Sequence, residues 1–351
     1  MAHTKKRHRR RIGKLVAGIG VALIVVAVGV IGYLLALQPV TLDKAYGQTQ
    51  IVRVEAHSGA AAIGARLEEK GLIRHAWAFT AQTYLTGAYR KLKAGSYQVS
   101  SAMSTGEIAA AMARGKMALR SVTFPEGLTL EGTATLLEKD GICQIPDFLG
   151  AATPEAVNQA LGTTLPASST QIDAAGFLFP DTYLLGSNDD PQRVVGLMLA
   201  EFKQKFYDPF WLPAVALKPW GNLLQVVTLG SLVEKEARVE AERPLIAGVL
   251  LHRLRTGMRL QCDATVQFAL GEHKARLTDR DLKIDSPYNT YLHPGLPPGP
   301  ICNPGLPSLQ AALHPGTTDY LFYVAKRDGT HAFAKTFEEH KANITALRGG
   351  H

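Results

Sequence analysis

An unbroken apolar segment near the N-terminus constrains this chain more than any other feature. Residues 15–37 are 23 consecutive uncharged residues, mainly Leu, Val, Ile, Ala and Gly. About 20 apolar residues in a helix are enough to cross the hydrocarbon core of a membrane. A cleaved signal peptide is the alternative, but its apolar region usually has about 7–15 residues before a small-residue cleavage site, of which Ala36-Leu37-Gln38 is a poor version. The segment therefore predicts a retained transmembrane helix.

Basic residues are concentrated on the N-terminal side of this segment. Seven of the 38 Lys and Arg residues lie in the first 14 positions, which contain no Asp or Glu. Because positively charged flanks stay on the cytoplasmic side, we expect residues 1–14 to be a cytoplasmic tail and residues 38–351 to lie outside the cytoplasmic membrane. The rest of the chain has 31 basic and 30 acidic residues, so its near-neutral charge does not favour nucleic-acid binding.

The composition predicts folded domains with neither a disulfide framework nor a metal site. The chain has 351 residues, 46% of them hydrophobic, which suits two or three structural units. Three cysteines are too few for a disulfide framework, although Cys262 and Cys302 would be able to pair if the fold brought them together. The Cys and His residues show no spacing typical of zinc ligands, so we expect no metal.

Short strand and helix patterns divide the rest of the chain. Residues 38–49 are expected to be a connector. Strands predicted at 51–54 and 95–99, with helices between and after them, indicate a small α+β module at 50–118. A larger α+β region at 119–348 contains the densest run of unusual motifs.

A helix predicted at 222–241 carries two candidate acids, Glu234 and Glu236. At about 100° per residue, its apolar residues crowd one broad face, so the helix should be mostly buried. Glu234 falls near that face and Glu236 at its edge. A carboxylate there has to be paired, solvated by a cleft, or protonated with a raised pKa. For either Glu alone, an ion pair with a core arginine, for example Arg243, Arg253 or Arg255, is an equally good interpretation. Residues two apart on a helix do not face each other, so a catalytic dyad is not expected.

Two later segments are candidate binding regions. The polar residues of 258–266 follow a helix predicted at 249–256, and they either line a site or, more simply, cap the next helix. Residues 286–291 contain two Tyr and one Asn, and the Pro- and Gly-rich run 295–305 follows. Aromatic faces and amide groups are suited to holding a sugar ring. An ordinary proline-rich surface loop is the alternative, and the apolar-periodic flanks and the shortage of charge weigh against it.

Taken together, these motifs resemble the YceG-like (MltG) family of endolytic murein transglycosylases. The resemblance rests on Pro125–Gly127, Gly176–Tyr183, Ser231–Ala237, Arg253–Thr265, Tyr288–Tyr291, Gly295–Ile301 and His314–Pro315. It implies an α+β fold with an N-terminal transmembrane helix, a small LysM-like α+β subdomain at 50–118 and a larger α+β YceG-like catalytic domain at 119–348. The catalytic domain would lie in the periplasm, anchored to the inner membrane. The implied partners are peptidoglycan glycan strands and, beside the membrane, peptidoglycan synthases and penicillin-binding proteins.

The same resemblance implies the reaction and its residues. Such enzymes cleave the MurNAc-GlcNAc bond within nascent glycan strands without a cofactor, leave 1,6-anhydro-MurNAc ends and act as terminases of glycan elongation. One Glu serves as acid and then as base. Related enzymes place it near the end of a buried helix before a small residue, which favours Glu236 and keeps Glu234 as the alternative. The residues implied to line the glycan cleft are Gln261, Asp263, Thr265, Tyr288, Asn289 and Tyr291.

One departure and two rival hypotheses accompany this interpretation. Family members commonly have Glu where this chain has Ala175, so any contribution of that Glu is expected to be dispensable here. A non-catalytic, membrane-anchored peptidoglycan-binding scaffold is the rival from another class, and the burial cost of a Glu beside the sugar-binding residues argues against it. Hydrolysis would need a base to activate water, for which Asp263 or Asp181 is available.

Overall fold

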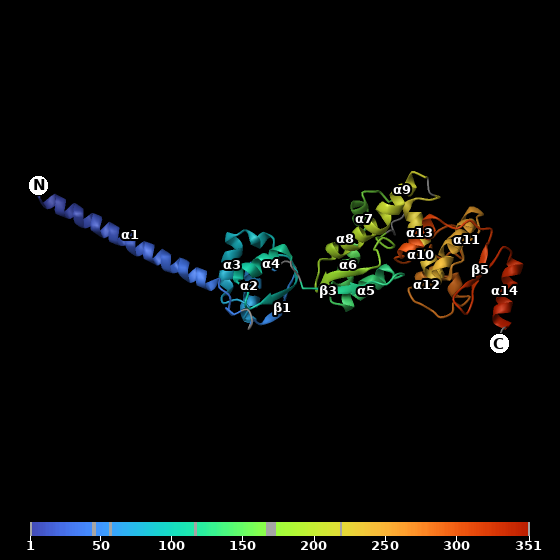
Figure 1. Cartoon of the computed structure of the whole chain (residues 1–351), viewed down its shortest axis with the longest axis horizontal. Coiled ribbons are helices and arrows are strands. Elements are labelled where there is room, and N and C mark those ends of the chain that lie inside the picture. Colours follow the sequence, from blue (N-terminus) through green and yellow to red (C-terminus); the bar gives the residue numbers. More distant parts are fainter. Residues whose placement is uncertain are drawn as a thin grey trace. The chain divides into compact units, whose positions relative to one another are not determined.

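The computed structural model describes residues 2–43, 47–55, 58–115, 118–165, 173–217 and 220–349. The side chains of the predicted basic tail at 1–14 lie outside the described residues, as do residues 44–46 of the predicted connector. Contacts divide the chain into two compact units (Figure 1). Unit 1 comprises residues 1–119 with 186–189, and unit 2 comprises residues 120–185 with 190–351.

Unit 1 begins with a long helix and continues as a small α+β body. Its elements are α1 (Ala2–Ala36), β1 (Thr49–Val54), α2 (Ala60–Glu69), α3 (Ala76–Leu85), the 3₁₀ turn η2 (Ala88–Arg90), β2 (Gly95–Ser100) and α4 (Thr105–Arg114). Within α1, the segment Ile19–Ala36 has a mean hydropathy of 2.7 and is long and apolar enough to cross a membrane. Its large apolar side chains are mostly exposed, as in a membrane anchor or a signal sequence rather than a core helix.

The body of unit 1 has its own apolar core. β1 and β2 pair antiparallel, with Val52 opposite Tyr97, and both side chains face the helices and are fully buried. Leu67 and Phe79 pack on them from α2 and α3. This separate core explains why the contacts group these residues as one unit.

Unit 2 is built mainly of helices with two small two-stranded sheets. Its elements are β3 (Leu119–Thr123), α5 (Leu130–Lys139), α6 (Ile145–Ala151), α7 (Pro154–Leu161), β4 (Thr182–Gly186), α8 (Pro191–Phe202), the π-helical η3 (Lys203–Trp211), α9 (Leu212–Val215), α10 (Leu223–Glu236), η4 (Glu240–Glu242), α11 (Arg243–Arg255), α12 (Asp263–Leu270), η5 (Asp281–Lys283), α13 (Leu306–Leu313), β5 (Phe322–Ala325), β6 (His331–Ala334) and α14 (Phe337–Gly349). β3 pairs with β4, and β5 pairs antiparallel with β6. The chain is therefore a mixed α+β protein.

Helix α10 lies at the centre of unit 2 and packs against α11 and α13. Asn222 begins it with a capping box, in which the Asn222 side chain accepts from the backbone of Gln225 and Gln225 bonds back. Every residue from Leu223 to Val233 except Gln225 is buried. The helix ends at Glu236, five residues before the predicted end at 241, because Ala237 adopts an extended backbone (ψ 125°). This early end corrects the sequence expectation.

The sequence motifs converge on the loop that precedes α13. The buried Asn303 accepts a hydrogen bond from Gly176 N–H on its side chain (2.8 Å) and one from Gly127 N–H on its carbonyl (2.8 Å). Gly176 has φ 81°, and a Cβ there would overlap the ring of Pro300, so this position requires glycine. Next along the loop, Ile301 N–H donates to Ser231 Oγ on α10 (3.0 Å). The motifs thus fix the loop against the helix that carries the two acids.

Candidate active site

The two glutamates at the end of α10 have different surroundings. Glu234 Oε1 lies 3.5 Å from the Arg243 guanidinium, and Glu234 Oε2 accepts a hydrogen bond from Gly305 N–H (3.0 Å). The Glu234 and Arg243 side chains are only 8% and 12% exposed. Arg243 also donates to Ser308 Oγ on α13 (2.9 Å). Glu234 is therefore held in an ion pair that joins α10, α11 and the start of α13.

Glu236 instead lies at the wall of a cavity of about 960 Å³. Its Oε2 accepts a hydrogen bond from the hydroxyl group of Tyr323 (3.1 Å), which comes from β5. Other walls of the cavity come from the start of α5, from α12 with the loop after it, and from the hairpin β5–β6. A cavity of this size is in the usual range for small-molecule and oligomer-binding pockets.

Burial raises the pKa of Glu236 to about 7. The hydrogen bond from Tyr323 and the charge of Arg253 oppose this rise, whereas the negative charge of Asp263 adds to it. Glu236 is also the last residue of α10, and the negative end of a helix dipole disfavours a carboxylate. A carboxyl group with a pKa raised in this way is suited both to giving and to taking a proton near neutral pH.

Three of the six predicted cleft residues line the same cavity as Glu236: Gln261, Asp263 and Tyr291. The Tyr291 hydroxyl donates to Asp263 Oδ1 (2.5 Å), so the two side chains form one polar group on the wall. Gln261 has an exposed side chain and a left-handed backbone (φ 52°), which is uncommon for a residue with a Cβ. The structure therefore brings these three residues and Glu236 to one cavity.

The other three predicted cleft residues do not line it. Thr265 and Asn289 are fully buried, and Tyr288 is partly buried against the ring of Phe268, at 4.7 Å between centroids. Thr265 Oγ1 donates to the Cys262 carbonyl (2.7 Å) and lies 2.9 Å from Thr290 Oγ1.

Asn289 holds the turn that precedes Tyr291. Its Nδ2 donates to the carbonyls of Leu282 (3.0 Å) and Ile284 (2.9 Å), and its Oδ1 accepts from Tyr291 N–H (3.0 Å). Thr265, Tyr288 and Asn289 therefore do not line the cavity, contrary to the expectation from the sequence. The polar atoms of Thr265 and Asn289 form hydrogen bonds with backbone groups instead. All three support α12, which carries Asp263, and the turn that carries Tyr291.

The capping interpretation of this region is also corrected. Asp263 is the first residue of α12, and Cys262 occupies the cap position without a side-chain cap bond. The Asp263 carboxylate is consequently available to Tyr291 and the cavity. Cys262 and Cys302 are buried thiols that form no disulfide, and their sulfurs bond to backbone carbonyls of Leu260 and Ser231, respectively.

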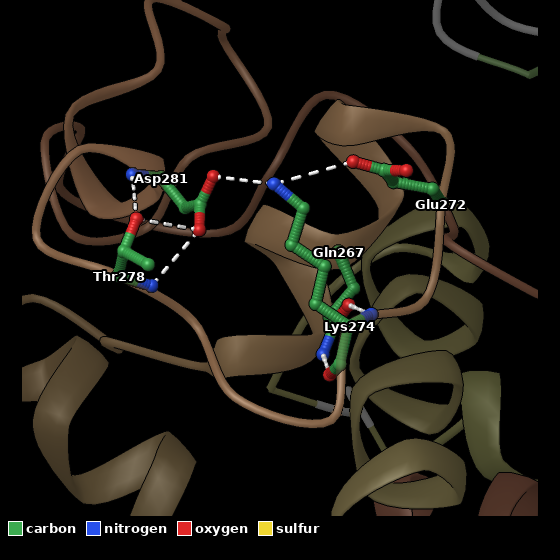
Figure 2. A network of polar contacts seen from close by, with 5 residues as sticks. All are labelled: Gln267, Glu272, Lys274, Thr278 and Asp281. Atoms are coloured by element: carbon green, nitrogen blue, oxygen red, sulfur yellow. Dashed lines mark hydrogen bonds and ion pairs between the residues drawn. The ribbon is translucent and has the colours of Figure 1, made fainter.

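A polar network fixes the loop after α12, part of which borders the cavity (Figure 2). Lys274 Nζ lies 2.7 Å from Asp281 Oδ1 and 3.2 Å from Glu272 Oε1. Asp281 Oδ2 accepts from both the backbone N–H (2.8 Å) and the hydroxyl (2.7 Å) of Thr278. Gln267 exchanges two hydrogen bonds with the backbone of Lys274, at 2.7 and 2.8 Å. The bonds that Asp281 accepts from Lys274 and Thr278 lower its pKa to about 2, and Lys274 is the largest cause.

Two important neighbours of Glu236 were missed from the sequence. Tyr323 lies on β5 and was not among the predicted site residues, and Arg253 was one of several candidate core arginines. Arg253 donates to the carbonyls of Leu260 and Leu321, both at 2.6 Å, and so connects α11 to the approaches of α12 and β5. The alternation of apolar residues around β5 was the only available signal for Tyr323, and it does not reveal which strand residue faces Glu236.

The hairpin that carries Tyr323 is fastened close to the end of α10. Glu242 Oε1 accepts from His331 N–H (3.0 Å), and Glu242 Oε2 lies 2.7 Å from His331 Nδ1. The His331 ring stands edge-on to the ring of Tyr323, at 5.5 Å between centroids. These contacts position the Tyr323 hydroxyl for its bond to Glu236. Among the described residues, no group of three or more His, Cys, Asp or Glu is arranged to hold a metal ion.

The fold and the cavity define a class of protein: a mixed α+β protein that presents one carboxyl group of raised pKa in a polar cleft. The sequence profile described as the YceG-like family matches residues 52–346. The chain is 32% identical over 313 residues to a Bacillus subtilis protein named endolytic murein transglycosylase, covering 87% of this chain and 86% of that protein. The chain belongs to the YceG-like family.

Two further similarities agree with this membership. A Streptococcus pneumoniae protein of the same name is 31% identical, and the match covers 80% of this chain and 55% of that longer protein. A crystal structure of a yceG-like protein from Listeria monocytogenes is similar with a TM-score of 0.57 and 33% identity, over 85% of this chain and 99% of that one.

Proposed function

We propose that this protein is an endolytic peptidoglycan lytic transglycosylase in which Glu236 is the single acid–base catalyst. The observation that carries the proposal is a carboxyl group with a pKa of about 7 at the wall of a cavity of about 960 Å³. The murein transglycosylase names of the relatives supply the substrate class, which is the glycan strand of peptidoglycan.

The reaction has two proton transfers and no added water. Protonated Glu236 gives its proton to the glycosidic oxygen between MurNAc and GlcNAc, and the bond from that oxygen to C1 of MurNAc breaks. The resulting Glu236 carboxylate then takes the proton from the C6 hydroxyl of the same MurNAc as its oxygen bonds to C1. The products are a strand with a 1,6-anhydro-MurNAc end, a strand with a free GlcNAc hydroxyl, and Glu236 in its starting state.

A pKa near 7 suits both transfers because neither protonation state of Glu236 is costly to reach at neutral pH. Tyr323 holds one carboxyl oxygen, which leaves the other to exchange the proton with the sugar. The joined side chains of Asp263 and Tyr291, together with Gln261, offer hydroxyl, carboxylate and amide groups to sugar hydroxyls along the same wall.

Glu234 remains the alternative acid, and its surroundings argue against it. Its carboxylate is already engaged by Arg243 and by Gly305 N–H, and the side chain is not among the residues that line the cavity. Ala175, at the position where the family resemblance implies a Glu, is buried, and its backbone N–H donates to Asp173 Oδ1 (2.7 Å).

The remaining parts of the proposal concern location and partners. The apolar segment of α1 would be a single-pass anchor in the cytoplasmic (inner) membrane, with the N-terminus in the cytoplasm and unit 2 in the periplasm. Residues 50–118 would be a LysM-like subdomain that binds glycan strands, and residues 119–348 the catalytic domain. Action on nascent strands beside the membrane would make the protein a terminase of glycan elongation, with peptidoglycan synthases and penicillin-binding proteins as partners.

The test is mass spectrometry of uncrosslinked glycan strands incubated with the full chain in H₂¹⁸O. We expect products that end in 1,6-anhydro-MurNAc and contain no ¹⁸O. Glu236→Gln should lose this activity, whereas Glu234→Gln should keep it per folded molecule. Loss in Glu234→Gln alone would transfer the acid role to Glu234.

Two other outcomes correspond to the rival functions. Reducing ends that carry ¹⁸O would show hydrolysis, for which Asp263 is a carboxylate at the cavity wall that would activate water. Asp181 does not line this cavity; its side chain accepts from Thr182 N–H. Strands that bind but stay intact would favour the non-catalytic peptidoglycan-binding scaffold.

A further inference from the structure

The outward face of α3 in unit 1 is apolar and aromatic. The helix buries Phe79 and Thr83 in the core of unit 1. Trp77, Tyr84 and Leu85, in contrast, are 54%, 58% and 76% exposed. At about 100° per residue, these three residues fall on the side of the helix opposite Phe79. Large apolar side chains gathered on one exposed face indicate a surface that meets a partner or a membrane.

This face is continuous with the end of the apolar helix α1. The Tyr33 hydroxyl, in the last turn of α1, donates to Gln82 Oε1 on α3 (2.7 Å). The rings of Tyr33 and Trp77 lie 6.1 Å apart between centroids. At a rise of 1.5 Å per residue, Tyr33 is about 4.5 Å along the helix axis from Ala36, the last residue of α1. If α1 crosses a bilayer, Trp77 therefore lies at the depth where the hydrocarbon meets the headgroups.

The chemistry of the face fits that depth. Trp and Tyr have an apolar ring and a polar group, and they are enriched where membrane proteins meet the headgroup region. Tyr84 stacks on Tyr89 at 4.4 Å between centroids, and the exposed Arg90 lies over the Tyr89 ring at 5.3 Å. A guanidinium beside such a face is attracted to anionic lipid headgroups.

We propose that Trp77, Tyr84 and Leu85 form a membrane-contacting face that lies in the headgroup boundary of the bilayer crossed by α1. The proposal rests on the anchor role proposed for α1 and adds a second attachment to it. The α+β body of unit 1 would then contact the lipid surface directly, in addition to its covalent connection to α1. A glycan strand is the other partner that stacks on exposed aromatic rings, and the same experiment tests it.

The experiment measures tryptophan fluorescence of the full chain in vesicles that contain anionic lipid. The lipid is either unmodified or brominated near the headgroup end of its acyl chains, where bromine quenches nearby indoles. The chain has three Trp residues, and the other two belong to unit 2. Trp211 is 7% exposed there, and Trp220 Nε1 donates to the Ala312 carbonyl (2.8 Å). Trp77→Phe, which keeps an aromatic ring, is the matched variant.

We expect brominated lipid to quench the wild-type protein and most of that quenching to disappear in Trp77→Phe. Flotation with the vesicles checks the anchor in the same samples. Protein that floats with equal quenching in both forms would overturn the membrane-contacting face while leaving the anchor intact. Protein that does not float would overturn both. A Trp77 signal that responds to soluble glycan strands but not to brominated lipid would identify the face as a glycan site instead.

Discussion

Removal of the Tyr323 hydroxyl group should change the pH range in which the enzyme works. In the structure this hydroxyl donates to Glu236 Oε2 at 3.1 Å and offsets part of the rise that burial causes, which leaves the pKa of Glu236 at about 7. A hydrogen bond to a charged group contributes about 1.5–3 kcal/mol, and about 1.4 kcal/mol corresponds to one pKa unit. A distance of 3.1 Å is long for such a bond, so we use the lower energy, about 1.5 kcal/mol. Tyr323→Phe should therefore raise the pKa of Glu236 by about one unit, to about 8.

The assay is the pH dependence of kcat/KM for release of 1,6-anhydro products. The free enzyme needs protonated Glu236, so kcat/KM should fall as the pH rises through the pKa of this group, about 7 in the wild type. In Tyr323→Phe the fall should occur about one unit higher. The ratio of variant to wild-type activity should therefore rise several-fold between pH 6 and pH 9. A merely structural role for Tyr323 would lower activity equally at every pH.

Tyr320→Phe is the matched control, because Tyr320 precedes the same strand and its ring packs on Phe333 at 5.6 Å between centroids. This control should leave the pH dependence unchanged. A basic limb that stays in place in Tyr323→Phe, or moves to lower pH, would refute the assignment of Glu236 as an acid held by Tyr323.

Three further substitutions test the site. The pKa of Glu236 in the folded protein (about 7) is above the ordinary 4.5, so ionisation of this group lowers the free energy of unfolding as the pH rises from 4.5 to 7. Glu236→Gln should therefore stabilise the protein by about 1–3 kcal/mol at pH 8, but not at pH 4, in urea titrations. Equal stability of the variant and the wild type at pH 8 would contradict this. Glu234→Gln should destabilise the protein by about 2 kcal/mol in the same titrations, because the buried Arg243 loses its acidic partner. An unchanged midpoint of urea unfolding would count against a structural ion pair. Asp281→Asn should raise KM for glycan strands with little change in kcat, because it loosens the loop that places Glu272 at the cavity; a fall in kcat alone would exclude this role.

Local patterns in the sequence were sufficient for much of the fold. The apolar run at 15–37 predicts the helix α1, and the structure has one continuous helix there from Ala2 to Ala36. The apolar periodicity of 222–241 predicts a buried helix, which the structure confirms over Leu223–Glu236. Such signals are readable because a helix repeats every 3.6 residues, so neighbours in the chain determine which face is apolar.

The apolar periodicity of 222–241 was enough to place Glu234 and Glu236 on a buried helix and to predict that they do not face each other, but it did not reveal that the helix ends at Glu236. The contacts of Glu234 with Arg243, and of Glu236 with the cavity and Tyr323, depend on how distant segments pack together. Tyr323 is 87 residues away in the chain, and no local pattern encodes such a contact. The burial of Thr265 was equally hidden, because it depends on the packing of α12 against the distant turn that contains Thr290. A pKa is set by the groups that surround a side chain in space, and the fold alone brings those groups together.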